Sequence, residues 1–377
     1  MRGQRLPAVF MRGGTSKAVL FHLRDLPRDR EEWDPLFLSV MGSPDANGRQ
    51  LDGMGGGISS LSKICIVGPP SRPDADVDYT FVQVHPREAR VDYSGNCGNM
   101  SSAIGPFAVD EGLVATADGD ATVRIHNTNT RKLIHGSFRV HQGRAAVEGD
   151  LEIPGVAGTG APVRLDFLQP GGASTGRLLP TGNAVDMLEV EGMGRVRVSM
   201  VDAANACVFV EAASLGLAGS EMPEALDANA AVLARLTAIR EAASVAMGIT
   251  RSRAEARTKP MIPFVGFVAP PQEATTLSGR RIAAAEIDLT VRMISNGQPH
   301  RALPLTGSLC TAVAAAIPDT IVGRLARPQS DAMLRLGMPS GILSVGADVV
   351  REGTGWHAER GAFYRTARRL FEGFVYP

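Results

Sequence analysis

Residues 9–26 read VFMRGGTSKAVLFHLRDL, and residues 198–215 read VSMVDAANACVFVEAASL. When the two stretches are superposed without gaps, Met11 falls on Met200. Each stretch predicts a strand, a turn of small residues and a second strand, because apolar residues flank the turn on both sides. The sequence thus predicts that a hairpin near the start of the chain recurs in its second half.

Three further similarities follow in the same order along the chain. They are Ser62–Pro70 with Thr258–Pro271, Val77–Val82 with Ile287–Arg292, and two glycine-containing turns before helix-like segments, Ser94–Cys97 with Thr306–Cys310. We interpret the four ordered matches as an internal duplication. The alternative is that strands of similar composition recur without common ancestry.

The remaining patterns predict the fold class. Alternating residues predict strands at 122–126, 137–140 and 196–200, and helical spacing predicts helices from Cys97, with Pro106 inside, and over 229–247. Helices are too few for a doubly wound parallel sheet. We expect an α+β protein with two similar halves of mostly antiparallel strands, and a ligand cleft between them.

Composition excludes several classes of partner. The 39 basic residues balance the 39 acidic ones without a basic stripe, which argues against nucleic acid and membrane surfaces. We find no signal peptide and no transmembrane stretch, so we expect a cytoplasmic protein. The four cysteines are widely spaced, which argues against disulfides and a structural metal site: Cys65, Cys97, Cys207 and Cys310.

Two short sequence motifs contain candidate catalytic residues. Gly53–Gly57 leads into Lys63, and Cys97 opens an apolar helix. An amine in glycine-rich surroundings and a thiol at the positive end of a helix dipole can serve as proton acceptor and donor. The alternatives are an exposed strand-edge lysine and a small core cysteine.

Several motifs together resemble the PrpF-type isomerases, which belong to the diaminopimelate-epimerase-like superfamily. The motifs are MRGGTSK (11–17), MGSPD (41–45), QLDGMGGGISSLSK (50–63), NCGN (96–99), GPFAVDEGLV (105–114), PTGNAVD (180–186) and PHRA (299–302). The family includes isomerases or tautomerases of 2-methylaconitate, 4-oxalomesaconate, 3-methylitaconate and aconitate. The resemblance covers the chain from about residue 8 to its end.

The resemblance implies two domains, 1–185 plus 366–377 and 186–365, each with strands curled around a central helix and an active site in the interdomain cleft. It also implies that Lys63 and Cys97 are the catalytic pair of a cofactor-independent isomerase, with no metal. Epimerase relatives use two cysteines. Here Cys310 lies one residue from the position that pairs with Cys97, so we expect Cys310 to be a packing residue.

Substrates of this family carry two or three carboxylates, so the site needs anion receptors. Backbone N–H groups in glycine turns and at helix starts suit this role, as do hydroxyl and amide side chains. The expected substrate-binding residues are Arg12, Gly14, Thr15, Ser16, Gly55, Gly56, Asn96, Gly98, Asn99, His300, Arg301, Gly307 and Ser308. The alternative role of the glycines is to form tight turns, and that of the charged residues is to form structural ion pairs.

Two other functions stay open at this point. One is an amino-acid epimerase or racemase on the same fold, which the lysine in place of a second aligned cysteine disfavours. The other is a non-catalytic partner of a dehydratase. The sequence does not select among the polycarboxylates, and a homodimer is compatible with it.

Overall fold

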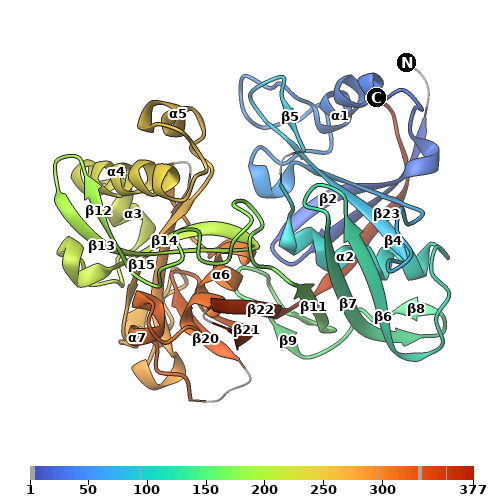
Figure 1. Ribbon diagram of the computed structural model, residues 1–377. Coiled ribbons are helices and arrows are strands. Elements are labelled where there is room, and N and C mark those ends of the chain that lie inside the picture. Colours follow the sequence, from blue (N-terminus) through green and yellow to red (C-terminus); the bar gives the residue numbers. More distant parts are fainter. Residues whose placement is uncertain (1–4, 94, 296, 330–332, 354) are drawn as a thin grey trace. The chain divides into compact units, whose positions relative to one another are not determined.

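The computed structural model describes residues 5–93, 95–295, 297–329, 333–353 and 355–377 (Figure 1). The chain forms two compact units, Met1–Asp166 with Tyr364–Pro377, and Phe167–Phe363. Both are built mostly of strands with few helices, which confirms the α+β class. The domain boundaries expected after residues 185 and 365 stay a prediction.

The first unit contains a curled sheet with one helix on each face. Its helices are α1 (Trp33–Met41) and α2 (Gly98–Asp110), with short 3-10 helices at Leu23–Asp25, Arg30–Glu32 and Ser59–Leu61. Its strands are β1 (Leu6–Gly13), β2 (Ser16–His22), β3 (Lys63–Gly68), β4 (Val77–Val84), β5 (Val91–Asp92), β6 (Gly119–Asn127), β7 (Lys132–His141), β8 (Arg144–Ala145), β9 (Leu151–Glu152), β10 (Thr159–Gly160), β11 (Val163–Leu168, continuing into the second unit) and β23 (Ala367–Val375).

Helix α2 is the central helix of this unit. All residues from Met100 to Val109 are buried, as expected for a helix that is packed on every side. It contacts β1, β2, β3, β6, β7, β8 and β23. The helix begins directly after Cys97, and Pro106 lies inside it, as the sequence predicts.

The other face of the sheet packs against α1. Ile64 and Ile66 of β3 join Leu36 and Phe37 of α1 in one apolar cluster. Because side chains alternate along a strand, the intervening residues Lys63 and Cys65 point to the face that carries α2. The alternation therefore places Lys63 on the face of the sheet that is covered by α2, the helix that begins after Cys97.

The second unit repeats this plan with added helices. Its helices are α3 (Pro223–Asp227), α4 (Ala230–Ala246), α5 (Arg253–Thr258), α6 (Leu305–Ala315) and α7 (Ile321–Leu325), with 3-10 helices at Ala212–Leu215 and Ala284–Glu286. Its strands are β12 (Asp186–Val190), β13 (Gly194–Ala203), β14 (Asn205–Glu211), β15 (Phe264–Ala269), β16 (Ala274–Thr275), β17 (Arg281–Ile282), β18 (Leu289–Ser295), β19 (Gln298–Pro299), β20 (Leu334–Met338), β21 (Gly341–Glu352) and β22 (Gly355–Arg365). Helix α6 contacts β13, β14 and β21.

The helix predicted over 229–247 is confirmed. Asn229 caps α4 by accepting the Val232 N–H, and Gly248 follows with a positive φ of 74°. Asparagine caps and left-handed glycines are ordinary helix ends.

Strand pairing confirms the duplication. In the first unit β1 and β2 form an antiparallel hairpin, β2 runs parallel to β3, and β3 is antiparallel to β4. In the second unit β13, β14, β15 and β18 have the same succession of pairings. Each set is followed by a buried helix, α2 or α6.

The register corrects one detail of that duplication. Ala18 pairs with Lys63 in the first unit, whereas Cys207 pairs with Phe264 in the second. Phe264 therefore takes the place of Lys63, and the matched Lys259 instead ends α5 and forms an ion pair with Glu255 at 2.8 Å. The sequence similarity was misleading here because several residues separate Lys259 from the start of β15.

Candidate active site

Lys63 is the first residue of β3 and is held from the neighbouring strand. Its side chain is buried, with 7% of the residue exposed, so the exposed-lysine alternative is wrong. Lys63 Nζ donates to Gln83 Oε1 at 2.5 Å and lies 5.0 Å from the centre of the Phe81 ring. Gln83 Nε2 in turn donates to the carbonyl oxygens of Ser59 and Ser62. This arrangement fixes the amine instead of leaving it mobile in solvent.

The glycine-rich loop before Lys63 is organised by Gln50. Gln50 is buried, and its Oε1 accepts the N–H of Gly57 at 2.8 Å and the hydroxyl of Ser62 at 2.5 Å. Its Nε2 donates to Ser43 Oγ at 2.8 Å. Gly55 lies so close to this amide that a Cβ would overlap it. The loop glycines therefore allow Gln50 to lie beside the backbone.

Asp45 fixes the other end of the same loop. Its carboxylate accepts the N–H groups of Asn47, Arg49 and Gln50 at 2.6 to 2.9 Å. These backbone bonds lower the pKa of Asp45. Gly56 packs against Leu61 in this segment. The described contacts give Gly55 and Gly56 a loop-forming role, and substrate binding by them stays a prediction.

Cys97 occupies the N-cap position of α2. It has extended backbone (φ −106°, ψ 100°), and its carbonyl accepts the first intrahelical bond, from Ser101 N at 3.0 Å. Its thiol lies 3.9 Å from Ser16 Oγ. Unlike the buried Cys65, Cys97 is partly exposed, so it is not simply a core cysteine. The N–H groups at Gly98 and Asn99 have no intrahelical acceptor and surround the thiol with partial positive charge.

Cys65 is a buried cysteine on β3, the strand that Lys63 begins. It lies two residues after Lys63 on the same face of β3, and burial raises its pKa far above that of an ordinary thiol. Its Sγ lies 3.8 Å from the Tyr79 hydroxyl, and its strand contacts α2, the helix that Cys97 caps. The structure therefore brings the predicted lysine and cysteine to one side of one sheet.

The hairpin turn between β1 and β2 lies against the start of α2. Asn99 Nδ2 donates to Thr15 Oγ1 at 3.1 Å, and Asn99 Oδ1 accepts the Thr15 N–H at 3.4 Å. Gly14 has a positive φ of 51°, and a Cβ there would overlap the Asn99 amide. The predicted residues Gly14, Thr15, Ser16, Gly98 and Asn99 thus lie together in the first unit.

Two arginines support this turn. Arg12 Nη1 donates to the carbonyl oxygens of Gly14 and Thr366 and to Thr366 Oγ1, at 2.9 to 3.0 Å. Arg365 Nε donates to Asn99 Oδ1 at 3.2 Å. Burial lowers the pKa of both guanidinium groups, to about 9 for Arg365. Desolvated cations beneath a turn and a helix N-terminus favour a bound anion.

The predicted residues of the second unit differ more from expectation. His300 Nε2 lies 2.6 Å from Ser295 Oγ, and burial lowers its pKa to about 4, so the ring is neutral at neutral pH. Arg301 is exposed and pairs with Glu224 at 2.6 Å. A neutral imidazole and an exposed, paired guanidinium make a weaker carboxylate clamp than the sequence suggested.

The start of α6 corrects the role given to the Ser308 N–H, whereas substrate binding by Gly307 stays a prediction. The helix begins at Leu305, so Gly307 lies inside its first turn, and the Ser308 N–H already donates to Pro304 O at 2.8 Å. The Ser308 N–H is therefore not an anion receptor. Pro304 holds the N-cap position that Cys97 holds in α2. Cys310 lies one and a half turns further on, fully buried, and donates to Val201 O, as expected of a packing residue.

Sequence reasoning missed four side chains that organise the site. Gln83 holds Lys63 and Arg365 holds Asn99, both predicted site residues. Gln50 holds the loop before Lys63, and Asn129 holds Phe81 and Tyr93. Sequence reasoning gave none of the four a role, although Gln50 begins the motif at 50–63.

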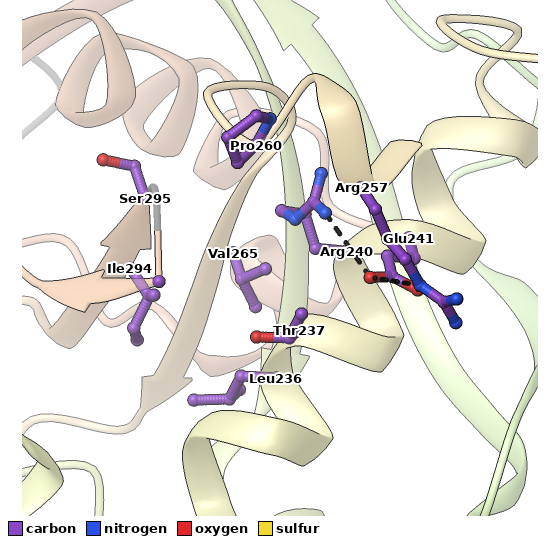
Figure 2. Close-up of a pocket in the computed structure, with 10 residues that line it drawn as sticks. Leu236, Thr237, Arg240, Glu241, Arg257, Pro260, Val265, Ile294 and Ser295 are labelled. Carbon is purple, nitrogen blue, oxygen red and sulfur yellow. Dashed lines mark hydrogen bonds and ion pairs between the residues drawn. The ribbon is translucent and has the colours of Figure 1, made fainter. Parts of the chain in front are cut away.

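A cavity of about 200 Å³ opens in the second unit between α4, α5, β15 and β18 (Figure 2). Arg240, Glu241 and Arg257 line its polar side, and Val265 and Ile294 are among its apolar walls. None of the predicted site residues lines it. Among the described residues, no group of three or more histidine, cysteine or acidic side chains is arranged to hold a metal ion. No helix in the described part of the chain is long and apolar enough to cross a membrane.

The sequence pattern of the family described as PrpF protein matches residues 3–377. The chain belongs to the PrpF family. This PrpF-family chain is 43% identical over 375 residues to a 3-methylitaconate isomerase of Eubacterium barkeri, with 99% of this chain and 97% of that protein covered. It is 40% identical to a 2-methyl-aconitate isomerase of Shewanella oneidensis (98% and 96% covered) and 36% identical to a (4E)-oxalomesaconate Delta-isomerase of Novosphingobium (98% and 97% covered).

Comparison with solved structures supports the same family and shows the fold. A methylitaconate-delta-isomerase resembles this PrpF-family chain with a TM-score of 0.88 at 42% identity, covering 99% of this chain and 95% of that one. A probable proline racemase shares the fold alone, with a TM-score of 0.53 at 14% identity and coverage of 98% and 92%. The predicted family and two-domain fold are confirmed, and the chain is an isomerase.

Proposed function

We propose that this PrpF-family isomerase moves a double bond, or interconverts cis and trans forms, in a small unsaturated di- or tricarboxylate. Lys63 and Cys97 would exchange protons with the carbon skeleton. The observation that carries the proposal is that Lys63 begins β3 and Cys97 caps α2, a helix that contacts β3. The Cys97 thiol lies 3.9 Å from Ser16 Oγ on β2, the strand that pairs with β3. The names of the relatives, which act on methylitaconate, methylaconitate and oxalomesaconate, support this substrate class.

In the proposed step the Lys63 amine removes a proton from a carbon next to the double bond. The electron pair of that C–H bond enters the conjugated system, and the negative charge spreads onto a substrate carboxylate. The Cys97 thiol then gives its proton to the carbon at the far end of the allylic system. Rotation in the delocalised intermediate before reprotonation exchanges cis and trans forms. The ammonium and thiolate return to their starting states by passing a proton through solvent.

This chemistry uses the chain's own groups and invokes no cofactor. Gln83 holds the Lys63 amine by accepting a hydrogen bond from it through Oε1, which orients the nitrogen. The helix N-terminus stabilises the thiolate that Cys97 becomes after donating its proton. These contacts therefore stabilise both groups in the charged forms that the step creates, the Lys63 ammonium and the Cys97 thiolate.

We assign the substrate carboxylates to the hairpin turn and the start of α2. Thr15 and Ser16 offer hydroxyl groups, and Gly98 and Asn99 offer N–H groups without intrahelical acceptors. The buried guanidinium of Arg365 lies directly behind Asn99. An anion at this place would offset the cost of burying that charge.

The test is proton NMR of the purified protein in D2O with cis-aconitate, trans-aconitate, 2-methylaconitate, 3-methylitaconate and 4-oxalomesaconate. We expect isomerisation, with deuterium entering the allylic position, for at least one of them. Lys63→Met and Cys97→Ala should lower the rate by about 100-fold or more, the usual contribution of a general acid or base. Cys310→Ala is the matched control, because that cysteine lies buried in α6 and donates to Val201 O.

The outcomes separate the alternatives. Near-normal turnover by Lys63→Met would show that the assigned base is wrong. Exchange with an amino-acid panel and none with the polycarboxylates would favour the epimerase alternative. An inert wild type in both panels would show that the proposed substrate class is wrong.

A further inference from the structure

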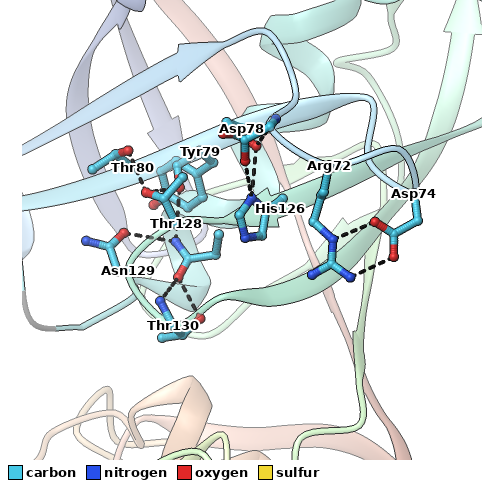
Figure 3. A network of polar contacts seen from close by, with 11 residues as sticks. Arg72, Asp74, Asp78, Tyr79, Thr80, His126, Thr128, Asn129 and Thr130 are labelled. Atoms are coloured by element: carbon cyan, nitrogen blue, oxygen red, sulfur yellow. Dashed lines mark hydrogen bonds and ion pairs between the residues drawn. The ribbon is translucent and has the colours of Figure 1, made fainter.

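The loop between β6 and β7, residues 128–131, lies beside β4 (Figure 3), and β4 pairs with β3, the strand that Lys63 begins. It follows Asn127, the last residue of β6, and contains Asn129. The proposed function gives neither asparagine a role. Both use their side-chain amides to bond backbone groups of distant segments.

The Asn129 amide makes three short bonds to two separate segments. Its Oδ1 accepts the Phe81 N–H at 2.8 Å, and its Nδ2 donates to Phe81 O at 2.9 Å and to Tyr93 O at 2.8 Å. The first two bonds reproduce the pairing that a neighbouring strand would make to β4. The third bond reaches the segment that follows β5.

Those two segments lead to the two candidate catalytic groups. Phe81 lies on β4 opposite Cys65, and its ring lies 5.0 Å from Lys63 Nζ. Tyr93 stands four residues before Cys97, in the stretch that enters α2. The Asn129 amide therefore connects β4, which lies beside Lys63, to the segment that leads into Cys97.

Asn127 supports the same connection from a buried position. Its Nδ2 lies 3.1 Å from Asn129 Oδ1 and 3.4 Å from Asn96 Oδ1, next to Cys97. Its Oδ1 accepts the N–H and the hydroxyl of Thr130 at 3.0 and 2.7 Å, which closes the loop on itself. These bonds fix the orientation of the Asn129 amide.

We propose that Asn129 is a positioning residue that sets the spacing between Lys63 and Cys97. This inference rests on the proposed function for its catalytic readout. The two groups come from different segments, β3 and the N-cap of α2, so their separation depends on the contacts that hold those segments together. Proton transfer to and from carbon depends steeply on that separation, because a displacement of about 1 Å can cost roughly 100-fold in rate.

The decisive variant is Asn129→Asp. It keeps the shape and the oxygen that accepts the Phe81 N–H, and it loses both donated bonds, to Phe81 O and Tyr93 O. Asn129→Ala is the second variant and removes all three. The matched control is Asn229→Ala, which removes a helix-capping asparagine of α4 in the other unit.

Two readouts are used at a temperature where circular dichroism shows each variant fully folded. The first is the steady-state rate with the substrate identified in the NMR panel, separated into kcat and KM. The second is the rate of Cys97 alkylation by iodoacetamide, which needs no substrate. The other three cysteines are buried, and Cys97→Ser gives the background.

We expect Asn129→Asp to lower kcat by about 10- to 100-fold with KM nearly unchanged, and to shift the alkylation rate. Asn229→Ala should match wild type in both. Wild-type kcat and alkylation in both folded Asn129 variants would overturn the inference. If wild type turns over no substrate, the proposed function fails, and the alkylation rate alone decides whether Asn129 positions Cys97.

Discussion

Gln50 offers the sharpest test of how the glycine-rich loop is held. Gln50→Ala removes three side-chain hydrogen bonds, to Ser43, Gly57 and Ser62. At about 0.5–1.5 kcal/mol for each bond, we expect a loss of about 3 kcal/mol in the free energy of unfolding. For a unit of this size that corresponds to a fall of roughly 6–12 °C in melting temperature.

The same variant should also slow the reaction. Ser62 precedes Lys63 directly, and its hydroxyl would lose the buried acceptor that Gln50 provides. We expect kcat to fall by about 10-fold or more, because the lysine nitrogen would lose its fixed position. The assays are differential scanning calorimetry and the NMR rate measured well below the melting temperature.

Gln142→Ala is the matched control. Gln142 has nearly the same backbone conformation, with φ of 51° against 54° for Gln50, but it lies exposed in a turn. Alanine replaces glutamine under the same backbone strain in both variants, so their difference excludes that strain and reports the buried Gln50 side chain with its hydrogen bonds. Equal melting temperatures and equal kcat for the two variants would refute the reasoning.

Three further predictions follow from the same contacts. Gly14→Ala should cost about 1–2 kcal/mol of folding free energy from its left-handed backbone alone, and should raise KM because a Cβ displaces the Asn99 amide; calorimetry and steady-state kinetics check this. Because backbone N–H groups lower the pKa of Asp45 below its ordinary 3.8, its stabilising effect is complete above that pH and is lost as the pH falls through the lowered value; Asp45→Asn should flatten this acid dependence in urea unfolding. Burial lowers the pKa of His300 from 6.5 to about 4, so the unfolded chain binds a proton that the folded chain refuses, and stability should fall as pH drops from 6.5 to 4; His300→Gln should reduce that slope in thermal unfolding between pH 4 and 7 and leave the part due to His85, whose pKa burial also lowers.

The sequence by itself determined the class, the duplication and the main helices. The apolar spacing after Cys97 predicts a helix with one buried stripe, and the spacing over 229–247 predicts α4 with its glycine end, whereas the burial of α2 on every side and the Asn229 cap are seen only in the structure. The predicted features are readable because they depend on residues close together in the chain. The grouping of Gly14, Thr15 and Ser16 beside the start of α2 also agrees with the motifs.

Only the tertiary structure decided which side chains hold those motifs in place. Arg365 reaches Asn99 from 266 positions away, and Asn129 joins Phe81 to Tyr93 across 48 and 36 positions. Strand register likewise decided that Phe264, and not Lys259, stands where Lys63 stands in the first unit. Such contacts depend on which strands become neighbours and in what register, and that is set by packing of the whole core and not by the local pattern.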